Sequence, residues 1–463
     1  MSLMNDWEKL FFRVWKSQVL FHHIFKFIKD TGKKYYKLES AHWICTNKHW
    51  GLLKDKFYQK ATLHYDRDTY SLIFQNIRDL EFFKDIYERQ KNSISQVGVN
   101  DAAKTGNLEI IKYLIDEFPS DVYMTEDAMD IAAQNGHVET LKYLRSIRSQ
   151  YSCTEKGLDT ASEIGSLECV QWITEFCPHV KCTKKAMTEA AKKGHIKVIE
   201  YLQEHHSEAI CEKEGFNFAA LNGHLEVVKF LHNNRSEGCS VDAMNYAAQN
   251  GHLEVIKFLH ENRKEGCTTY AFDISAKNGY LDIVKFLHNN RTEGCTVNAV
   301  NHAAISGHKN VVEYLLDNRT EGCTTFGFDY VCFQGNLEMV ELLHNRGKKC
   351  SFRAMNMAAQ NGHLHIVEFL HVNRQEGCTS DAIDLAALGG HLRVIEFLHH
   401  NRIEGCSELA VDNAAQMGYF PIVQFLLTFR PMDGFKNAIS LAENHGYNDI
   451  VELLKKNIHH QKI

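Results

Sequence analysis

Residues 251–260 read GHLEVIKFLH, and near copies of this stretch recur along most of the chain. The glycine that opens each copy lies 27 to 30 residues after the previous one. The glycines at this place are Gly106, Gly136, Gly165, Gly194, Gly223, Gly251, Gly279, Gly307, Gly335, Gly362, Gly390, Gly418 and Gly446. Self-similarity at a fixed period outranks other sequence signals, because it decides the architecture. The sequence therefore predicts thirteen units of about 28 residues.

The unit that begins at Thr268 shows how each copy should fold. Thr268 is a good N-cap, and residues 271–276 place small and apolar side chains on one face of a short helix. Gly279 ends this helix, because glycine tolerates the left-handed conformation. Residues 281–288 predict a second helix, and residues 290–295 reverse the chain. Helices of about ten residues are unstable alone, so the units must stack into an all-α solenoid.

The motif AAxxGHLEV(I/V)KxL, which stands at 219–231 and 247–259 and more loosely at 358–370, resembles the heart of the ankyrin repeat. The family's period is usually about 33 residues, so the resemblance implies that the hairpin between repeats is reduced to a short loop. The family's Thr-Pro-Leu-His segment is replaced by x-Ala-apolar-Asp/Asn. These short, His- and Cys-rich units are most similar to the large ankyrin arrays of amoebae and giant viruses. The resemblance implies a non-catalytic scaffold that binds a protein partner on a concave face.

Composition and charge place the chain in a broad class. It has 463 residues with 44% hydrophobic and 24% charged residues and a net charge of −6, which excludes disordered and collagen-like chains. No uncharged apolar run approaches the ~18 residues that span a bilayer. Asp6 and Glu8 do not suit a secretory signal. We expect a soluble intracellular protein, cytoplasmic with a nuclear location left open.

The sequence divides into three regions. Residues 1–95 form an aromatic-rich helical module, residues 96–457 the repeat array, and residues 458–463 a polar tail. Residues 96–463 hold 35 basic and 47 acidic side chains, which argues against nucleic acid as a partner. The chain has no Gly-x-Ser-x-Gly, no P-loop and no Gly-x-Gly-x-x-Gly that opens a helix, so we expect neither an enzyme nor a cofactor.

Three ladders of repeated residues resemble sites. Ten cysteines from Cys153 to Cys406 recur every 27 to 29 residues, and we interpret them as small core residues because equivalent atoms of stacked helices are too far apart for disulfides. The Gly-His histidines, such as His252, should bond backbone between units, and a His/Cys metal site is the alternative. The Asn-Arg-x-Glu-Gly loops, such as Arg291 with Glu293, predict a lattice of exposed ion pairs. An anion-binding ridge is the alternative there.

Binding specificity should come from residues that change between units while the surrounding motif stays fixed. The column just before the Ala-Ala pair holds Tyr246, Ile274, His302, Tyr330, Met357, Leu385 and Asn413, and we expect it to face a partner. Phe333 and Phe352 are apolar where other units are polar. The unit around 326–335 departs most from its neighbours and is the predicted hot spot.

Residues 1–95 show no 28-residue period and hold four of the five tryptophans, with 17 basic and 11 acidic residues. Part of this region resembles a degenerate F-box. The residues that would bind a Skp-type adaptor are Val19, Ile24, Phe25, Ile28 and Trp50. This resemblance implies the substrate receptor of a cullin-type ubiquitin ligase. An aromatic helical cap over the open end of the solenoid explains the same residues, and a basic membrane- or nucleic-acid-facing module is a third alternative.

Overall fold

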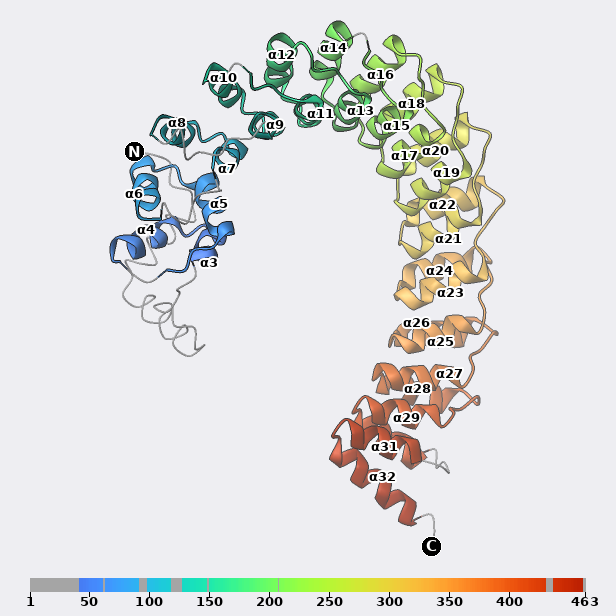
Figure 1. Ribbon diagram of the computed structural model, residues 1–463. Helices are drawn as coiled ribbons and strands as arrows, with labels where there is room; N and C mark the ends of the chain where they lie inside the picture. Colours follow the sequence, from blue (N-terminus) through green and yellow to red (C-terminus); the bar gives the residue numbers. More distant parts are fainter. Residues whose placement is uncertain are drawn as a thin grey trace, which may run out of the picture. The chain divides into compact units, whose positions relative to one another are not determined.

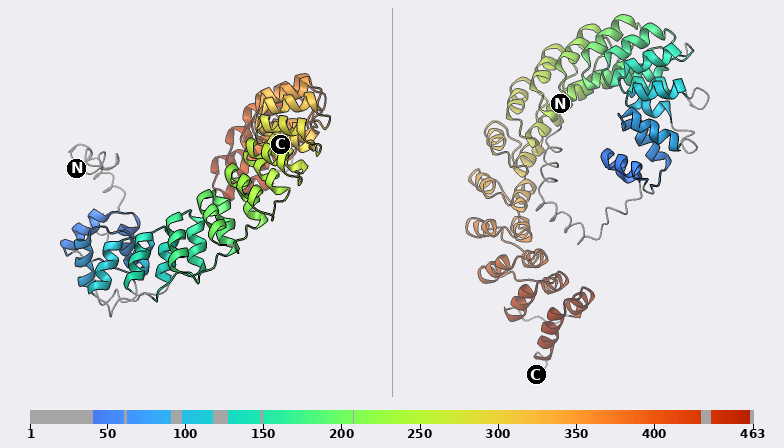
Figure 2. Two further views of the ribbon diagram at one scale, coloured as in Figure 1. Left: turned by 90° about the horizontal axis from the view of Figure 1, so that it is seen from above. Right: turned by 90° about the vertical axis from the view of Figure 1, so that its left-hand side faces the viewer.

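The computed structural model describes residues 41–60, 63–90, 98–117, 127–147, 150–206, 208–429 and 436–460. Within these ranges every regular element is an α-helix, as the sequence predicts. The chain divides into two compact bodies, an N-terminal body (Met1–Glu212) and a C-terminal body (Lys213–Ile463). Each body is built from helix pairs that follow one another in chain order (Figures 1 and 2).

Thirteen helix pairs match the thirteen predicted units, and each pair has a first helix before the turn glycine and a second helix after it. The pairs of the N-terminal body are α7 (Val99–Lys104) with α8 (Leu108–Glu117), α9 (Asp127–Gln134) with α10 (Val138–Ile147), α11 (Glu155–Glu163) with α12 (Leu167–Phe176), and α13 (Lys184–Lys193) with α14 (Ile196–His205). The pairs of the C-terminal body are α15 (Lys213–Leu221) with α16 (Leu225–Asn234), α17 (Asp242–Asn250) with α18 (Leu253–Asn262), α19 (Thr269–Lys277) with α20 (Leu281–Asn290), α21 (Val297–Ile305) with α22 (Lys309–Asn318), α23 (Thr325–Gln334) with α24 (Leu337–Asn345), α25 (Arg353–Gln360) with α26 (Leu364–Asn373), α27 (Asp381–Gly389) with α28 (Leu392–Asn401), α29 (Leu409–Gln416) with α30 (Phe420–Phe429), and α31 (Lys436–Asn444) with α32 (Asn448–His460).

The core lies between the two rows of helices in each body. In the pair α19–α20, Ala271 and Phe272 of the first helix and Val284 and Leu287 of the second are 3% exposed or less. The small residues of the first helices let neighbouring first helices pack more closely than neighbouring second helices do. Each stack is therefore tighter on its first-helix side.

The turn between the two helices of a pair requires glycine for two reasons. Gly279 has a φ of +79°, a conformation in which a side chain is strained. In addition, a methyl group at this position would lie 2.6 Å from Nδ1 of His308, whose ring covers the turn from the next repeat. The turn glycine therefore both ends the first helix and provides room for the neighbouring repeat.

Residues 41–90 extend the helix stack of the N-terminal body, although their sequence has no 28-residue period. They form α3 (Ala41–Thr46), α4 (Trp50–Tyr58), α5 (Arg67–Asn76) and α6 (Leu80–Gln90), and α5 packs on α7. The Asn107 Nδ2 donates to the Ile77 carbonyl at 2.6 Å across this contact. At the other end of the chain, α32 continues to His460, so the start of the expected polar tail is helical.

Candidate functional site

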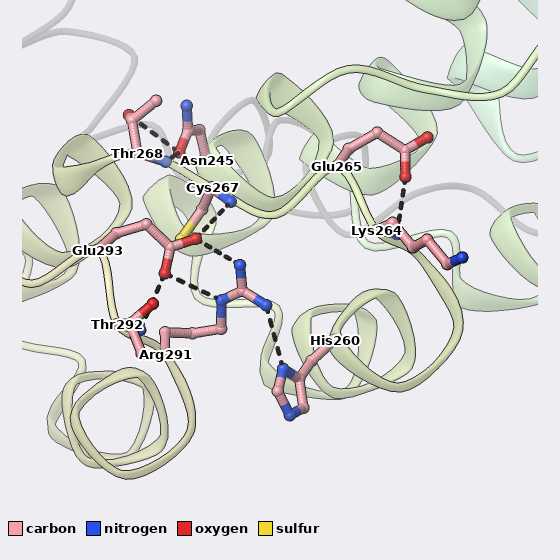
Figure 3. Close-up of polar contacts among 9 residues, drawn as sticks. All are labelled: Asn245, His260, Lys264, Glu265, Cys267, Thr268, Arg291, Thr292 and Glu293. Carbon is pink, nitrogen blue, oxygen red and sulfur yellow. Dashed lines mark hydrogen bonds and ion pairs between the residues drawn. The ribbon is translucent and has the colours of Figure 1, made fainter.

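The Asn-Arg-x-Glu-Gly loops line one edge of the C-terminal body, which we call the loop edge. In Figure 3 the Arg291 guanidinium pairs with Glu293 of its own loop. The same carboxylate accepts a hydrogen bond from the Cys267 N–H at 3.2 Å, and Arg291 lies 3.4 Å from Nδ1 of His260. The predicted Arg–Glu pairs are therefore present, and further contacts of the same side chains tie a repeat to the preceding one. The ion pair itself lies within one loop, and other contacts join the repeats.

The expectation that these ion pairs are exposed is wrong. In the six loops the Arg and Glu side chains are only 13% to 30% exposed. The Arg291–Glu293 pair, for example, lies against Gly266 and Cys267 of the preceding loop. The hydrogen bond from Arg402 lowers the pKa of Glu404 to about 2. With its own carboxylate engaged, each guanidinium is occupied, so the structure does not favour an anion-binding ridge.

A buried Asp or Asn in each typical first helix holds the start of the next repeat. Asp384 accepts hydrogen bonds from the Ser407 N–H at 2.9 Å and from the Ser407 hydroxyl at 2.5 Å. Asn301 accepts from the Thr324 N–H at 2.9 Å and donates to the Thr324 hydroxyl at 2.9 Å. Sequence reasoning noted this Asp/Asn position but missed its role. Its signal was a polar residue at a fixed place beside the buried Ala-Ala pair.

Most cysteines of the ladder lie in the core. All fourteen cysteines of the chain are free, and Cys239 and Cys267 are buried. Burial raises the pKa of Cys267 to about 11, so its thiol stays protonated near neutral pH. The interpretation as small core residues is confirmed for six of the ten ladder cysteines, which are buried. The other four are half-buried: Cys295, Cys323, Cys378 and Cys406.

The histidines also serve contacts between repeats. His195 Nε2 lies 3.0 Å from the Glu163 carbonyl, and His363 Nε2 lies 3.0 Å from the Phe333 carbonyl, as predicted for the Gly-His histidines. The last-turn histidines of second helices meet an aromatic ring of the next repeat edge-on, at 5.5 Å for His260 and Phe286. Among the described residues, no three His, Cys, Asp or Glu side chains gather as a metal site would require.

The exposed side of the first helices, which we call the first-helix face, carries the predicted variable column. The residues of that column are all half-buried: Tyr246, Ile274, His302, Tyr330, Met357, Leu385 and Asn413. Tyr246 stacks on Phe218, with ring centroids 6.0 Å apart. Asn413 donates from Nδ2 to the Asp384 carbonyl at 2.9 Å, so its amide already joins two repeats. Aromatic and aliphatic side chains thus occupy most of this column.

The predicted hot spot on α23 forms an aromatic stripe. Phe326, Tyr330 and Phe333 follow one another at helical spacing, and Tyr330 lies 4.5 Å from Phe326 and 5.9 Å from Phe333 between ring centroids. Phe326 is 53% exposed, and Phe352, the N-cap residue of the neighbouring α25, is 43% exposed. Sequence reasoning noted Phe326 but left it out of the predicted binding residues. Its place four residues before Tyr330 is the signal that could have included it.

The opposite side of each stack, the second-helix face, has a different surface. Lys257 pairs with Glu254 at 2.7 Å, and Lys309 pairs with Glu338 of the next second helix at 2.6 Å. These four side chains are between 41% and 69% exposed. Paired charges in water form a well-solvated surface with little to gain from contact with a partner.

Of the five predicted adaptor-binding residues, only Trp50 lies among the described residues. Val19, Ile24, Phe25 and Ile28 lie outside the described residues. Trp50 is the first residue of α4 and is half-buried. In the same helix Leu53 and Phe57 are buried.

No helix in the described part of the chain is long and apolar enough to cross a membrane.

Family models for ankyrin repeats match more than half of the chain. The model for three copies matches residues 158–245, 216–298, 244–325 and 272–351, and the model for many copies matches residues 100–145, 357–399 and 383–427. A search of curated proteins finds no match. Among solved structures, the crystal structure of the human ASB11 ankyrin repeat domain is similar at 20% identity with a TM-score of 0.31, over 41% of this chain and 96% of that domain.

Proposed function

Because the chain belongs to the ankyrin repeat family, whose repeats are protein-interaction modules, we propose that it is a non-catalytic scaffold that holds a protein partner on the first-helix face of its C-terminal body. The aromatic stripe of Phe326, Tyr330 and Phe333 is the observation that carries this proposal. Exposed aromatic side chains contribute most to protein interfaces when a partner covers them.

The tighter side of the stack suits this role. The first helices pack more closely than the second helices, which favours a curve toward the first-helix face, and a partner placed there can touch several repeats at once. The polar ties between repeats, such as Asp384 to Ser407, fix the spacing of these helices before binding. A preformed surface loses little conformational entropy on association.

Purification of the tagged full-length protein from cells that produce it tests the proposal. The variant Phe326→Ala/Tyr330→Ala should lose a partner that the wild type retains, with an unchanged circular dichroism spectrum. The control Lys257→Ala/Lys309→Ala removes two side chains of similar length from the second-helix face and should retain the partner. A partner that binds the aromatic variant as well as the wild type would contradict the proposal.

For the N-terminal helices we propose the cap function. Polar contacts support it: Ser71 and Gln75 of α5 bind Asp101 of α7, the latter at 3.0 Å, and Arg78 donates to the Thr105 carbonyl at 3.2 Å. Through these contacts α5 and α6 pack on the array as a further helix pair would, and so cover its end. Mixing the full-length protein with a purified Skp-type adaptor should give no complex in size-exclusion chromatography. A stoichiometric complex would instead favour the ligase receptor.

A further inference from the structure

We propose that the segment held on the first-helix face is an acidic linear stretch of another protein, anchored by apolar side chains. This inference rests on the proposed function and deepens it. The carrying observation is that the aromatic stripe of α23 lies beside cations without acidic partners, in a repeat whose loop lacks the Arg–Glu pair of the six regular loops.

The loop after α24 differs from the six regular loops. It reads Arg346-Gly347-Lys348-Lys349, with Lys348 in place of the regular glutamate and Lys349 in place of the regular glycine. Arg346 pairs with Asp317 of α22 instead of with its own loop. Neither Lys348 nor Lys349 has an acidic partner within 4.0 Å among the described residues. A neutral Arg–Glu unit is thus replaced by two free positive charges.

These lysines lie near the N-terminal ends of α23 and α25, the helices beside the exposed rings of Phe326 and Phe352. The Lys348 side chain extends over Gly322, because a methyl group placed on Gly322 would lie 3.4 Å from the Lys348 Nζ. Gly322 stands two residues before Thr324, the N-cap residue of α23. Lys349 is exposed and stands three residues before Phe352. Arg353, the first residue of α25, is also exposed and without an ion pair in the described part of the chain. The cations therefore border Phe326 and Phe352.

No free carboxylate balances these cations on the central first helices. From α19 to α25 the acidic residues of the first helices are Asp273 and Asp329. Asp273 is held by the Thr296 N–H at 2.9 Å, and Asp329 by the Ser351 N–H at 2.9 Å. Charges on a surface act over about 8–10 Å at physiological salt. These hydrogen bonds leave the carboxylates charged, and Asp329 interacts electrostatically with Arg353, whereas Lys348 and Lys349 form no ion pair among the described residues. The aromatic stripe is therefore within reach of a net positive charge, which an acidic partner complements.

The limited length of the basic region favours a short peptide over a nucleic acid. Exposed acidic residues return on the two first helices that follow, where Asp381 opens α27 and Glu408 precedes α29. A polyanion that ran along the first helices would meet these carboxylates. An acidic peptide can place its apolar anchors on Phe326 and Tyr330 and its carboxylates beside Lys349 and Arg353.

Selection of peptides from a displayed library of random linear sequences, with the full-length protein as bait, tests the inference. We expect selected peptides to combine Asp or Glu with Phe, Leu or Trp. The variant Lys349→Glu/Arg353→Glu should weaken the best peptide about tenfold and reduce the salt dependence of its binding, a change of about 1.4 kcal/mol. The matched control Lys257→Glu/Lys309→Glu makes the same charge change on the second-helix face and should bind as the wild type does.

The other outcomes overturn the inference in distinguishable ways. Selected peptides without acidic enrichment, which still require Phe326 and Tyr330, would refute the acidic partner and leave the proposed function standing. Peptides that bind independently of both sites would refute both. A library that yields no binder refutes the linear segment. Binding of a labelled random single-stranded oligonucleotide that needs Lys349 and Arg353 would assign the surface to nucleic acid instead.

Discussion

The loop edge and the first-helix face belong to the same repeats, yet they differ in what stays constant. On the loop edge the same side chains recur and each is engaged, as Arg291 and Glu293 are with their own loop and with the preceding repeat. On the first-helix face one backbone position carries Tyr246, His302 or Met357 in different repeats. The repeated residues of the loop edge thus hold the repeats together, and the variable residues of the first-helix face supply the surface for recognition.

The comparison becomes sharper at α23 and α24, where both regions change together. The aromatic stripe on the first-helix face and the basic loop Arg346–Lys349 occur in one repeat. The core of this repeat is kept, because Val331 and Cys332, which replace the usual Ala-Ala pair, are fully buried. The core side chains of this repeat are thus exchanged but stay buried, and a partner can reach only the departures on its surface.

The largest effect on the free energy of unfolding should follow from a cavity in the core between the repeats. Leu287 is 2% exposed, and Leu287→Ala should lower the free energy of unfolding by about 2–5 kcal/mol because it leaves a cavity between repeats. Urea unfolding followed by circular dichroism measures the loss. Partner binding per folded molecule should not change. An unfolding curve equal to that of the wild type would show that the second helices do not form this core.

A smaller effect should follow from cutting one polar tie between repeats. Asp384→Ala leaves the Ser407 N–H without its acceptor and should cost about 1–3 kcal/mol in the free energy of unfolding. The chain itself supplies the control, since Asn301 fills the same position in another repeat. Asp384→Asn should therefore stay within about 0.5 kcal/mol of the wild type. Equal losses in both variants would contradict the proposed tie.

The loop edge predicts a pH dependence of stability. The pKa of Glu404 is lowered to about 2 by Arg402, below the ordinary value of 4.5, so the ionised carboxylate stabilises the folded state above pH 4.5. This contribution is lost as the pH falls from 4.5 through about 2. In thermal unfolding, the wild type should lose about 1 kcal/mol more than Glu404→Gln over this window. Parallel pH profiles for the two proteins would contradict it.

The smallest effect should come from the second-helix face. Lys257 and Glu254 are exposed partners on one helix, and such pairs contribute about 0.2–0.5 kcal/mol. Lys257→Ala should therefore shift the unfolding midpoint barely, and partner binding should not change. Isothermal titration with a selected peptide measures the latter. A loss of binding would place the partner on the second-helix face and contradict the proposed function.

Local sequence rules predicted the fold of the array almost completely. The period located the thirteen turn glycines, which all have positive φ, and the Thr268 cap and the buried Ala271 lie where the pattern placed them. A helical cap at this end was among the predictions, but the helix bounds and the packing of α5 on α7 were not predicted. Its helix ends and contacts, such as Asn107 with the Ile77 carbonyl, use residues that no repeat period marks.

The candidate site was predicted only in part, because exposure depends on neighbouring helices. The spacing of Tyr330 and Phe333 predicts a shared face, but the 53% exposure of Phe326 depends on how closely the adjacent first helices pack. The burial of the Arg–Glu pairs was missed for the same reason. The Arg291–Glu293 pair packs on Gly266 and Cys267 of the preceding loop, and a motif read within one loop does not include that contact.

Site-specific photo-crosslinking tests the central claim most directly. A photoreactive phenylalanine analogue replaces Tyr330 on the first-helix face or Lys309 on the second-helix face of the full-length protein, which is then irradiated in the cells that produce it. We predict discrete protein adducts from position 330 that position 309 does not give and that Phe326→Ala weakens. The same adducts from both positions, or adducts from position 309 alone, would contradict binding on the first-helix face.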